Sequence, residues 1–312
     1  MGIVVIGAVF VDTKGFPMDK YIPQGRNVGW IEEVHGGVSR NVAEDIANVE
    51  LRPTYVSLVD KNGVGEEVIR KLRSHKVNTD YILPVRNGMG TWLAIFDHGG
   101  DVVASISQRP DMSPLIDLLD EKGDEIFSNA DSIVIEICLD KEIIKRAFRL
   151  AKKYGKPIYA VVANMSIAVE RRDFLQDTAC FICNRQEAGI LFSDDYSGKS
   201  IPEMETILAE KVRRARIPSM IITLGDKGAV YADMFGYKGY CPARNVIVKD
   251  TTGAGDAFCA GVAVGLTYGK TLAEACEIGS FLAASVIMTS ENVCPRFLPS
   301  ELGIDIEVPD DD

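Results

Sequence analysis

Short apolar runs alternate along this chain with segments of helical periodicity, and this alternation constrains the fold more than any other feature of the sequence. The apolar runs are continuous, which is typical of strands buried on both faces of a parallel sheet. Strand–helix–strand order therefore predicts an α/β fold with a mainly parallel central sheet and helices on both faces. The expected strands are residues 3–6, 54–59, 132–137, 157–162, 181–184 and 220–223, and the expected helices are residues 41–49, 65–74, 141–154 and 203–215.

Two helix starts carry a capping sequence. Ser200 stands three residues before Glu203, and Thr271 stands three residues before Glu274, which is the spacing of a capping box. Pro202 follows Ser200 closely, in the first turn where proline is tolerated. These signals predict helices that begin directly after Ser200 and after Thr271.

Two stretches break the alternation. Residues 10–35 have no helical period, and residues 90–106 have the pattern of a hairpin that turns at His98-Gly-Gly100. Strands outside the alternating core predict a small separate sheet, placed as a lid over an open edge of the main sheet. We therefore expect one domain over residues 1–304, with lid segments at about 10–35 and 88–110, and an acidic tail over residues 305–312.

The charge balance limits the partners of this chain. The sequence has 34 basic and 45 acidic side chains, for a net charge of −11, which argues against nucleic-acid or anionic-membrane binding. An anionic ligand stays compatible with this charge, because backbone amides can bind phosphate. No apolar run approaches the roughly 20 residues of a membrane span, and residues 1–7 resemble a first strand rather than a signal peptide.

The seven cysteines indicate a reduced, cytoplasmic protein, because their number is odd and most lie in apolar segments. Cys180 and Cys183 have a spacing that also occurs in redox and zinc sites. No second such pair exists to complete a zinc site. Two buried cysteines in a strand are the simpler interpretation.

The segment Asp250-Thr-Thr-Gly-Ala-Gly-Asp256 carries the strongest chemical signal. The small residues Gly253, Ala254 and Gly255 precede a helical pattern, so backbone amides at a helix N-terminus can approach an anion closely. Such an arrangement suits a transferring phosphoryl group. Asp256 falls in the first helical turn, where its carboxylate can accept the proton of an attacking hydroxyl. The alternative interpretation is an ordinary glycine-rich turn with Asp256 as a cap.

This segment resembles the C-terminal signature of the PfkB carbohydrate kinases, the ribokinase-like family. Gly36-Gly-Val-Ser-Arg-Asn-Val-Ala43 resembles the N-terminal signature of that family. The Walker phosphate loop is absent, and the first strand is followed by Gly7 alone rather than by a dinucleotide-binding fingerprint. The resemblance implies a three-layer αβα sandwich with a small β-sheet lid. It also implies an enzyme that uses ATP and Mg²⁺, with Asp256 as the catalytic base.

The resemblance also assigns roles to residues that contact the substrate. In the family, the Gly-Gly turn and the asparagine, here Gly36, Gly37 and Asn41, contact the substrate. Asp12 stands where the family's aspartate binds a pair of sugar hydroxyls, and an ionised carboxylate has enough acceptor sites for both. Glu136 ends a predicted strand where sugar kinases place a hydroxyl acceptor, although a solvated strand-end carboxylate is an equal alternative.

Nucleotide and ion contacts follow from the same resemblance. Asn184 and Glu187 match the family's Asn-x-x-Glu motif, in which Glu187 would help place Mg²⁺ through water. The alternative for this pair is a helix cap. The loop that contains Thr223, Gly225 and Gly228 resembles one that lines the nucleotide site. Residues 290–295 correspond to the monovalent-cation loop of the family, and the resemblance does not decide whether they bind K⁺.

The substrate is constrained more weakly. Val38 follows the second glycine where ribokinases have lysine, and this favours pseudouridine or another nucleoside over a free sugar such as ribose or fructose. Trp30 and Trp92 lie in the lid segments, where they could stack on a base or pack the lid. The lids of the family often pair between subunits, which implies a homodimer. A non-catalytic sensor with the same fold is the competing class.

The sequence departs from the family pattern at two helix ends. Glu50-Leu51 stands where the family usually has Leu-Gly after the helix, and Lys76 stands where a glycine usually ends a helix.

Overall fold

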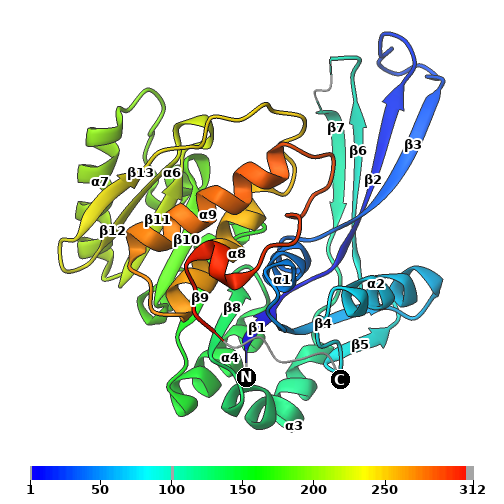
Figure 1. Cartoon of the computed structure of the whole chain (residues 1–312). Helices are drawn as coiled ribbons and strands as arrows, with labels where there is room; N and C mark the ends of the chain where they lie inside the picture. The colour runs from blue at the N-terminus through cyan, green and yellow to red at the C-terminus, as the bar shows by residue number, and fades with distance from the viewer. Residues whose placement is uncertain (1, 100–101, 307–312) are drawn as a thin grey trace.

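The computed structural model describes residues 2–99 and 102–306. Within these residues, the main sheet has nine strands in the order β13-β12-β11-β10-β9-β8-β1-β4-β5 (Figure 1). The seven neighbouring strands β11, β10, β9, β8, β1, β4 and β5 run parallel, whereas β12 and β13 add an antiparallel edge. Their bounds are β1 Ile3–Ile6, β4 Thr54–Asp60, β5 Ile82–Val85, β8 Ser132–Glu136, β9 Ile158–Val161, β10 Cys180–Asn184, β11 Ser219–Thr223, β12 Ala229–Asp233 and β13 Lys238–Cys241.

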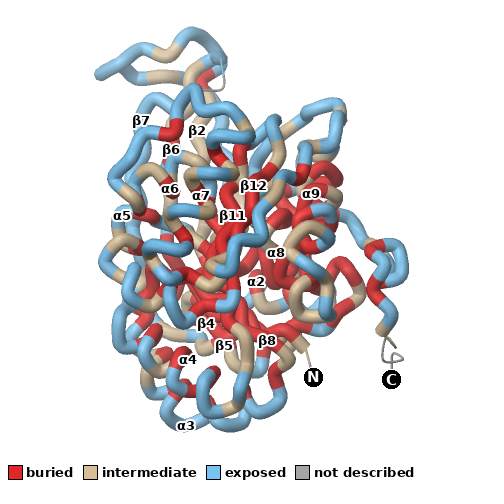
Figure 2. The backbone as a smooth tube through the Cα atoms, turned by 90° about the vertical axis from the view of Figure 1, so that its left-hand side faces the viewer, coloured by how far each residue is buried: buried red, intermediate tan, exposed pale blue. Residues whose placement is uncertain are grey.

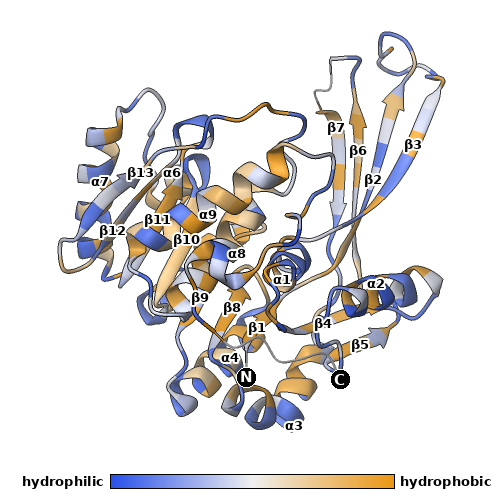
Figure 3. Cartoon of the chain, in the orientation of Figure 1, coloured by the Kyte–Doolittle hydropathy of each residue, from blue (hydrophilic) through white to orange (hydrophobic). Residues whose placement is uncertain are grey.

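Helices cover both faces of this sheet, which gives three layers. Val4 and Ile6 of β1 pack into one core with α3, α4, α6 and α7, whereas Ile3 and Val5 pack into a second core with α1, α2, α8 and α9. Figure 3 shows hydrophobic residues concentrated in the central strands. The helices are α1 Val38–Asn48, α2 Gly63–Ser74, α3 Pro114–Ser128, α4 Lys141–Tyr154, α5 Met165–Ala168, α6 Arg185–Phe192, α7 Ile201–Ala215, α8 Ala254–Thr267 and α9 Leu272–Ile287.

A separate four-stranded sheet stands beside this body, in the order β3-β2-β6-β7. Its strands are β2 Phe10–Pro17, β3 Gly29–Gly36, β6 Gly90–Phe96 and β7 Val102–Gln108. Figure 2 shows the strands of this small sheet as exposed or half-buried along most of their length, in contrast to the buried main sheet. The predicted second sheet is therefore confirmed. Part of the predicted turn at residues 98–100 and most of the tail 305–312 lie outside the described residues.

The two capping boxes form as predicted. Glu203 Oε2 accepts a hydrogen bond from Ser200 N at 2.8 Å, and Glu274 Oε2 accepts from Thr271 N at 2.8 Å. The first long helix differs from the prediction, because α1 begins at Val38 rather than at residue 41. Gly37, with a φ of 100°, is its N-cap, so the Gly-Gly turn leads directly into the helix.

Both departures from the family pattern at helix ends occupy a backbone conformation that favours glycine. Glu50 has a φ of 57° and Lys76 has a φ of 66°. Lys76 Nζ lies 3.4 Å from Glu50 Oε2, so an ion pair joins the two residues. This contact links the ends of two helices in a way that two glycines could not.

Cys180 and Cys183 lie on opposite faces of β10 and pack into different hydrophobic cores. Burial raises the pKa of both thiols above the ordinary value. The described residues contain no group of three or more His, Cys, Asp or Glu side chains arranged to hold a metal. No described helix is long and apolar enough to cross a membrane. The interpretation of the two cysteines as core residues thus fits the structure.

Candidate active site

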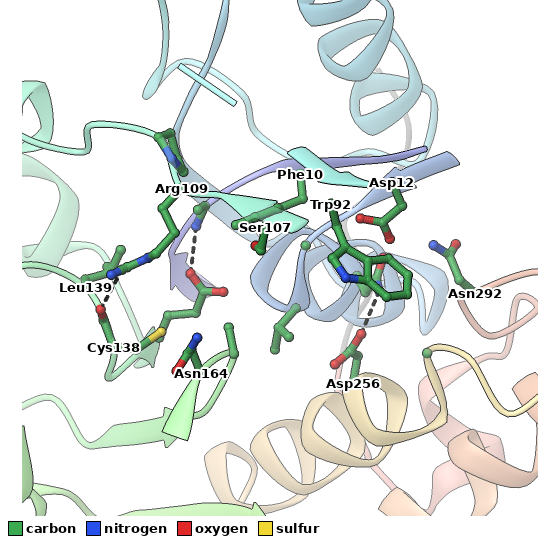
Figure 4. Close-up of a pocket in the computed structure, with 18 of the residues that line it drawn as sticks. Phe10, Asp12, Trp92, Ser107, Arg109, Cys138, Leu139, Asn164, Asp256 and Asn292 are labelled. Carbon is green, nitrogen blue, oxygen red and sulfur yellow. Dashed lines mark hydrogen bonds between the residues drawn. The ribbon is translucent and has the colours of Figure 1, made fainter. Parts of the chain in front are cut away.

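A cavity of about 430 Å³ lies between the carboxyl ends of β1, β8 and β9 and the small sheet. Ligands in open α/β sheets bind at this edge, so the position alone marks a candidate site. The small sheet supplies Phe10, Asp12, Trp92 and Ser107 (Figure 4). The remaining lining residues are Ala8, Gly37, Val38, Asn41, Arg109, Pro110, Met112, Glu136, Cys138, Leu139, Ala163, Asn164, Thr252, Gly253, Asp256 and Asn292.

Asp256 lies in the first turn of α8 and faces this cavity. Asn41 Nδ2 donates a 2.6 Å hydrogen bond to Asp256 Oδ2. Burial raises the pKa of Asp256 to about 6, and the charges of Asp12 and Glu187 act in the same direction. The hydrogen bond from Asn41 and the charge of Arg40 oppose this shift. Asp256 is therefore a carboxylate near neutral pH with a raised affinity for a proton.

Gly253 shapes the start of α8. It is the N-cap residue with a φ of 80°, and a Cβ at this position would lie 2.0 Å from Asn292 O. A Cβ on Gly255 would meet no heavy atom within 4 Å, so the helix end is open beside Asp256. The amide of Ala254 donates to Thr251 O at 3.3 Å, and this amide is therefore already paired. Unpaired amides of the first helical turn would complete an anion-binding site here.

Asp12 and the Gly-Gly turn meet on the opposite wall. A Cβ on Gly36 would lie 2.4 Å from Asp12 Oδ2, and a Cβ on Gly37 would lie 2.6 Å from Ala8 O. Gly36 is thus needed for close packing against the carboxylate, and Gly37 is needed for close packing against the backbone after β1. Burial raises the pKa of Asp12, while the charges of Lys14 and Arg40 oppose the shift. Asp12, Gly37, Asn41 and Asp256 therefore lie together at one end of the cavity.

Glu136, at the end of β8, is buried rather than solvated, with 2% of its surface exposed. Its Oε2 accepts a hydrogen bond from Ala8 N at 2.8 Å. Its Oε1 has no hydrogen-bond partner among the described residues. Burial raises the pKa of Glu136 to about 7. The cavity therefore has a second buried carboxyl group with an unused acceptor.

A buried arginine supports the end of the cavity that holds Asp12 and Asp256, and the sequence prediction missed it. Arg40 is 1% exposed and donates to Asn41 Oδ1, to Glu44 Oε2 and, at 2.6 Å, to His35 O. Because Arg40 holds the amide oxygen of Asn41, the amide nitrogen is directed to Asp256. The signal available in the sequence is the place of Arg40 in the Gly-Gly segment, directly before Asn41.

The model of the pfkB family of carbohydrate kinases matches residues 2–295 of this chain. The chain belongs to the PfkB family. It is therefore a phosphotransferase that acts on a hydroxyl group.

Curated relatives narrow the class to sugar and nucleoside kinases. Guanosine-inosine kinase from Exiguobacterium acetylicum is 34% identical, over 93% of this chain and 95% of the relative. Pseudouridine kinase from Escherichia coli is 25% identical, over 87% of this chain and 86% of the relative. The solved structure of Arabidopsis thaliana ribokinase with ribose and ATP has a TM-score of 0.81 at 19% identity, and covers 96% of this chain and 98% of that chain. This likeness confirms the ribokinase-like αβα fold.

In this PfkB kinase, the residues expected at the nucleotide lie beside the cavity rather than in its wall. Asn184 and Thr223 are register partners at the carboxyl ends of β10 and β11. Asn184 Oδ1 accepts from Glu187 N at 2.9 Å, and Glu187 Oε2 accepts from Asn184 N at 2.7 Å. The capping alternative is therefore realised in the structure. A Mg²⁺ contact through water would use the remaining carboxylate oxygen, and burial raises the pKa of Glu187.

The two glycines of the nearby loop differ in their surroundings. Gly225 has a φ of 65° and open space where a side chain would lie. Gly228 has a φ of 94°, and a Cβ there would lie 2.1 Å from Cys241 O. Gly228 thus lets the loop pack against β13, whereas Gly225 leaves room for a ligand.

The tryptophans of the small sheet have different surroundings. Trp92 lines the cavity, whereas Trp30 is 51% exposed and stacks on Phe16, with 5.4 Å between the ring centroids. In the loop 290–295, Asn292 lines the cavity and donates to His35 O at 3.0 Å. Trp92 is thus the tryptophan placed to contact a ligand in the cavity.

Proposed function

We propose that this PfkB kinase transfers the γ-phosphate of ATP to a hydroxyl of a nucleoside, with a guanosine- or inosine-type substrate favoured. One observation supports a nucleoside over a free sugar. The cavity continues beyond the sugar-sized end around Asp12 and Asp256 to a second end lined by Arg109, Leu139 and Asn164. Its volume of about 430 Å³ falls in the usual range for pockets that enclose small ligands. Phe10 and Trp92 offer aromatic surface for a base.

The chemistry follows from the residues at the catalytic end. Asp256 accepts the proton of the substrate hydroxyl as its oxygen bonds to the γ-phosphorus, and the bond from phosphorus to the β,γ-bridging oxygen breaks. ADP leaves with that oxygen. The start of α8 stabilises charge that develops on the phosphoryl oxygens. Asp12 would hold sugar hydroxyls, and Gly36, Gly37 and Asn41 would position the sugar.

ATP would lie over the carboxyl ends of β10 and β11, near Asn184, Thr223 and Gly225. Mg²⁺, when bound with ATP, would neutralise phosphate charge, and Glu187 would hold it through water. In this proposal residues 1–304 act as one kinase domain in the cytoplasm, and the small sheet acts as a lid over the pocket. A K⁺ site at residues 290–295 stays a prediction.

Pseudouridine is the second candidate substrate. Val38 lines the cavity after the Gly-Gly turn, and a pseudouridine kinase is among the relatives. Guanosine, inosine and pseudouridine are all nucleosides whose base carries a carbonyl next to an N–H group. The 34% identity to guanosine-inosine kinase is the reason to place the purines first.

The test is ADP release from ATP and Mg²⁺ with guanosine, inosine, pseudouridine, adenosine, cytidine, ribose and fructose. We expect the highest kcat/KM with inosine or guanosine. Turnover of pseudouridine alone would support the second candidate. Turnover of ribose or fructose alone would contradict the proposal of a nucleoside kinase.

We also propose that a second copy of the chain covers the outer face of the small sheet. Ile31, Leu93 and Ile106 share that face by strand register, opposite to Asp12 and Trp92, and are 73%, 42% and 70% exposed. An apolar face of this kind favours association. Light scattering should give the mass of a dimer, and Ile106→Glu should give a monomer; a monomeric wild type would refute the proposal.

A further inference from the structure

The cavity has two chemically different ends. Figure 4 shows Asp256 and Asn292 at one end and Arg109, Cys138, Leu139 and Asn164 at the other, with Phe10 and Ser107 between them. The catalytic end presents carboxylates to a sugar and a phosphate. The far end has a different set of groups, and a base attached to that sugar would lie against them.

Arg109 supplies hydrogen-bond donors to this far end. It follows β7 directly, and its Nη2 donates a 2.8 Å hydrogen bond to Cys138 O. This bond fixes the guanidinium against the wall formed by the segment after β8. A guanidinium has five N–H donors and no acceptor, so further donors remain for a ligand. Among the described residues that line the cavity, Arg109 is the one with a basic side chain.

Glu136 supplies a matching acceptor. It stands two residues before Cys138, whose carbonyl holds Arg109, and it lines the same cavity. Its Oε1 is buried and has no hydrogen-bond partner in the described parts of the chain. A buried acceptor without a partner is costly, and a ligand N–H would satisfy it. The charge of Arg109 also favours the ionised form of Glu136 by lowering its pKa, against the larger effect of burial.

We propose that Arg109 and Glu136 form a donor–acceptor pair that recognises the lactam edge of a nucleobase. Arg109 donates to the carbonyl oxygen, and Glu136 accepts from the adjacent ring N–H. The proposal rests on the proposed function, since it requires a nucleoside whose sugar lies at Asp256. It goes further by excluding adenine, whose corresponding edge has an amino donor next to a ring acceptor. That edge would place donor against donor and acceptor against acceptor, and the buried Oε1 of Glu136 would be left unpaired.

The experiment compares inosine with purine riboside, which lacks both the carbonyl oxygen and the ring N–H. We measure binding of each nucleoside by calorimetry without ATP, and kcat/KM with ATP. The variants are Arg109→Met and Glu136→Gln, with Arg149→Met as control. Arg149 lies on α4 with an exposed side chain and a distant surface ion pair. Glu136→Gln keeps the shape of the buried side chain, and Arg109 is exposed enough for its replacement to fold.

We expect the wild type to bind inosine more tightly than purine riboside and adenosine. The ratio of inosine to purine riboside affinity should fall about 10- to 100-fold in each variant, the effect of losing a hydrogen bond to a charged group. The ratio should not change in Arg149→Met. In the Glu136→Gln variant, the discrimination against adenosine should also weaken, because the new amide can donate to the ring acceptor of adenine.

Three results would overturn the proposal. The first is a wild type that binds inosine no more tightly than purine riboside. The second is an unchanged ratio in Arg109→Met. The third is an equal loss for inosine and purine riboside in Glu136→Gln, which would assign Glu136 to a sugar hydroxyl. Selective binding of inosine without turnover of any nucleoside would instead refute the proposed function alone and leave the base-recognition pair standing. Absence of binding to any nucleoside would refute both.

Discussion

Asn41 Nδ2 and Asp256 Oδ2 are joined by a 2.6 Å hydrogen bond, although 215 positions separate the two residues in the chain. The bond connects α1, which follows the Gly-Gly turn, to α8, which carries the expected phosphate site. It also orients the carboxylate, since one of its oxygens is held while the other stays available to a substrate. The two signature segments of the sequence thus act as one unit at the catalytic end.

Replacement of Asp256 should remove the chemical step and preserve the fold. Asparagine has the same shape as aspartate but cannot take up a proton, so we expect kcat to fall about 10²- to 10⁴-fold in Asp256→Asn. Circular dichroism checks the fold, and calorimetry with ATP checks nucleotide binding. A variant that keeps the wild-type kcat would exclude Asp256 as the base.

The rate should fall in acid as Asp256 becomes protonated. The base must be ionised, and its pKa is raised to about 6, so kcat/KM should be lost as the pH falls through about 6. Asp12 and Glu187 raise this pKa, and Asn41 and Arg40 lower it. The substrate for this measurement should be purine riboside. The pKa of Glu136 is raised to about 7, so its titration would also change the binding of inosine. Purine riboside has no ring N–H for Glu136 to accept, so this second titration should not affect its rate. A rate independent of pH between 5 and 7 would contradict the assignment.

Arg40 should influence this titration without contacting substrate. Its charge lowers the pKa of Asp256, so the acid limb should move to higher pH in Arg40→Met and stay closer to wild type in Arg40→Lys. Loss of Arg40 also removes the partner of Glu44 Oε2 and leaves that buried carboxylate with Lys71 Nζ, 3.4 Å from its Oε1, which should cost up to about 3 kcal/mol of stability. If Arg40 affects stability alone, its replacement will lower the melting temperature, and the pH at which the folded enzyme loses its rate will not change. That outcome would exclude a positioning role.

Two glycines of one segment provide a matched pair. Gly253→Ala places a Cβ against Asn292 O at a φ of 80°, and we expect a loss of about 1–3 kcal/mol of stability and a reduced kcat. Gly255→Ala meets open space inside a helix, where alanine is favoured by up to about 1 kcal/mol. Thermal unfolding should therefore separate the two variants. Equal melting temperatures would contradict the account of Gly253.

Glu187 can be tested against a second capping box. Glu187→Gln and Glu203→Gln each weaken a cap, and both should change the free energy of unfolding by no more than about 1 kcal/mol. The Mg²⁺ concentration that gives half-maximal rate should rise about tenfold in Glu187→Gln alone, as for other residues that hold a metal through water. The same rise in both variants, or in neither, would leave Glu187 with a structural role only.

The central strands could be predicted because burial on both faces removes polar residues from them. The strands β1, β4 and β8 to β11 were predicted within two residues at each end, and the small sheet was recognised because residues 10–35 lack helical periodicity. The edge hairpin β12–β13 was missed. Its outer strand, Lys238–Cys241, is half-exposed and has no continuous apolar run, so the pattern used for the inner strands does not apply to it.

The supporting residues of the site could not be predicted from local patterns. Arg40 and Glu44 have the spacing of an exposed helical ion pair, yet both are buried, because α1 packs against the main sheet and α8. Arg109 lies in a segment without periodicity, and only the folded chain brings it to Cys138. The sequence motifs mark groups that line the cavity, whereas the groups that orient them depend on tertiary placement.

The position of β1 has a consequence for synthesis on the ribosome. This strand precedes both of its neighbours, β4 and β8, in the chain, so a nascent chain cannot complete its pairing until residues 132–135 have been translated. The end of the cavity around Asp256 forms later still, because Asp256 and Asn292 lie in the last quarter of the chain. Ribosome-bound intermediates therefore expose apolar strands while most of the chain is made, which is a state that molecular chaperones recognise. Chains truncated before α8 should be inactive and prone to aggregation, even though most of the main sheet is present in them.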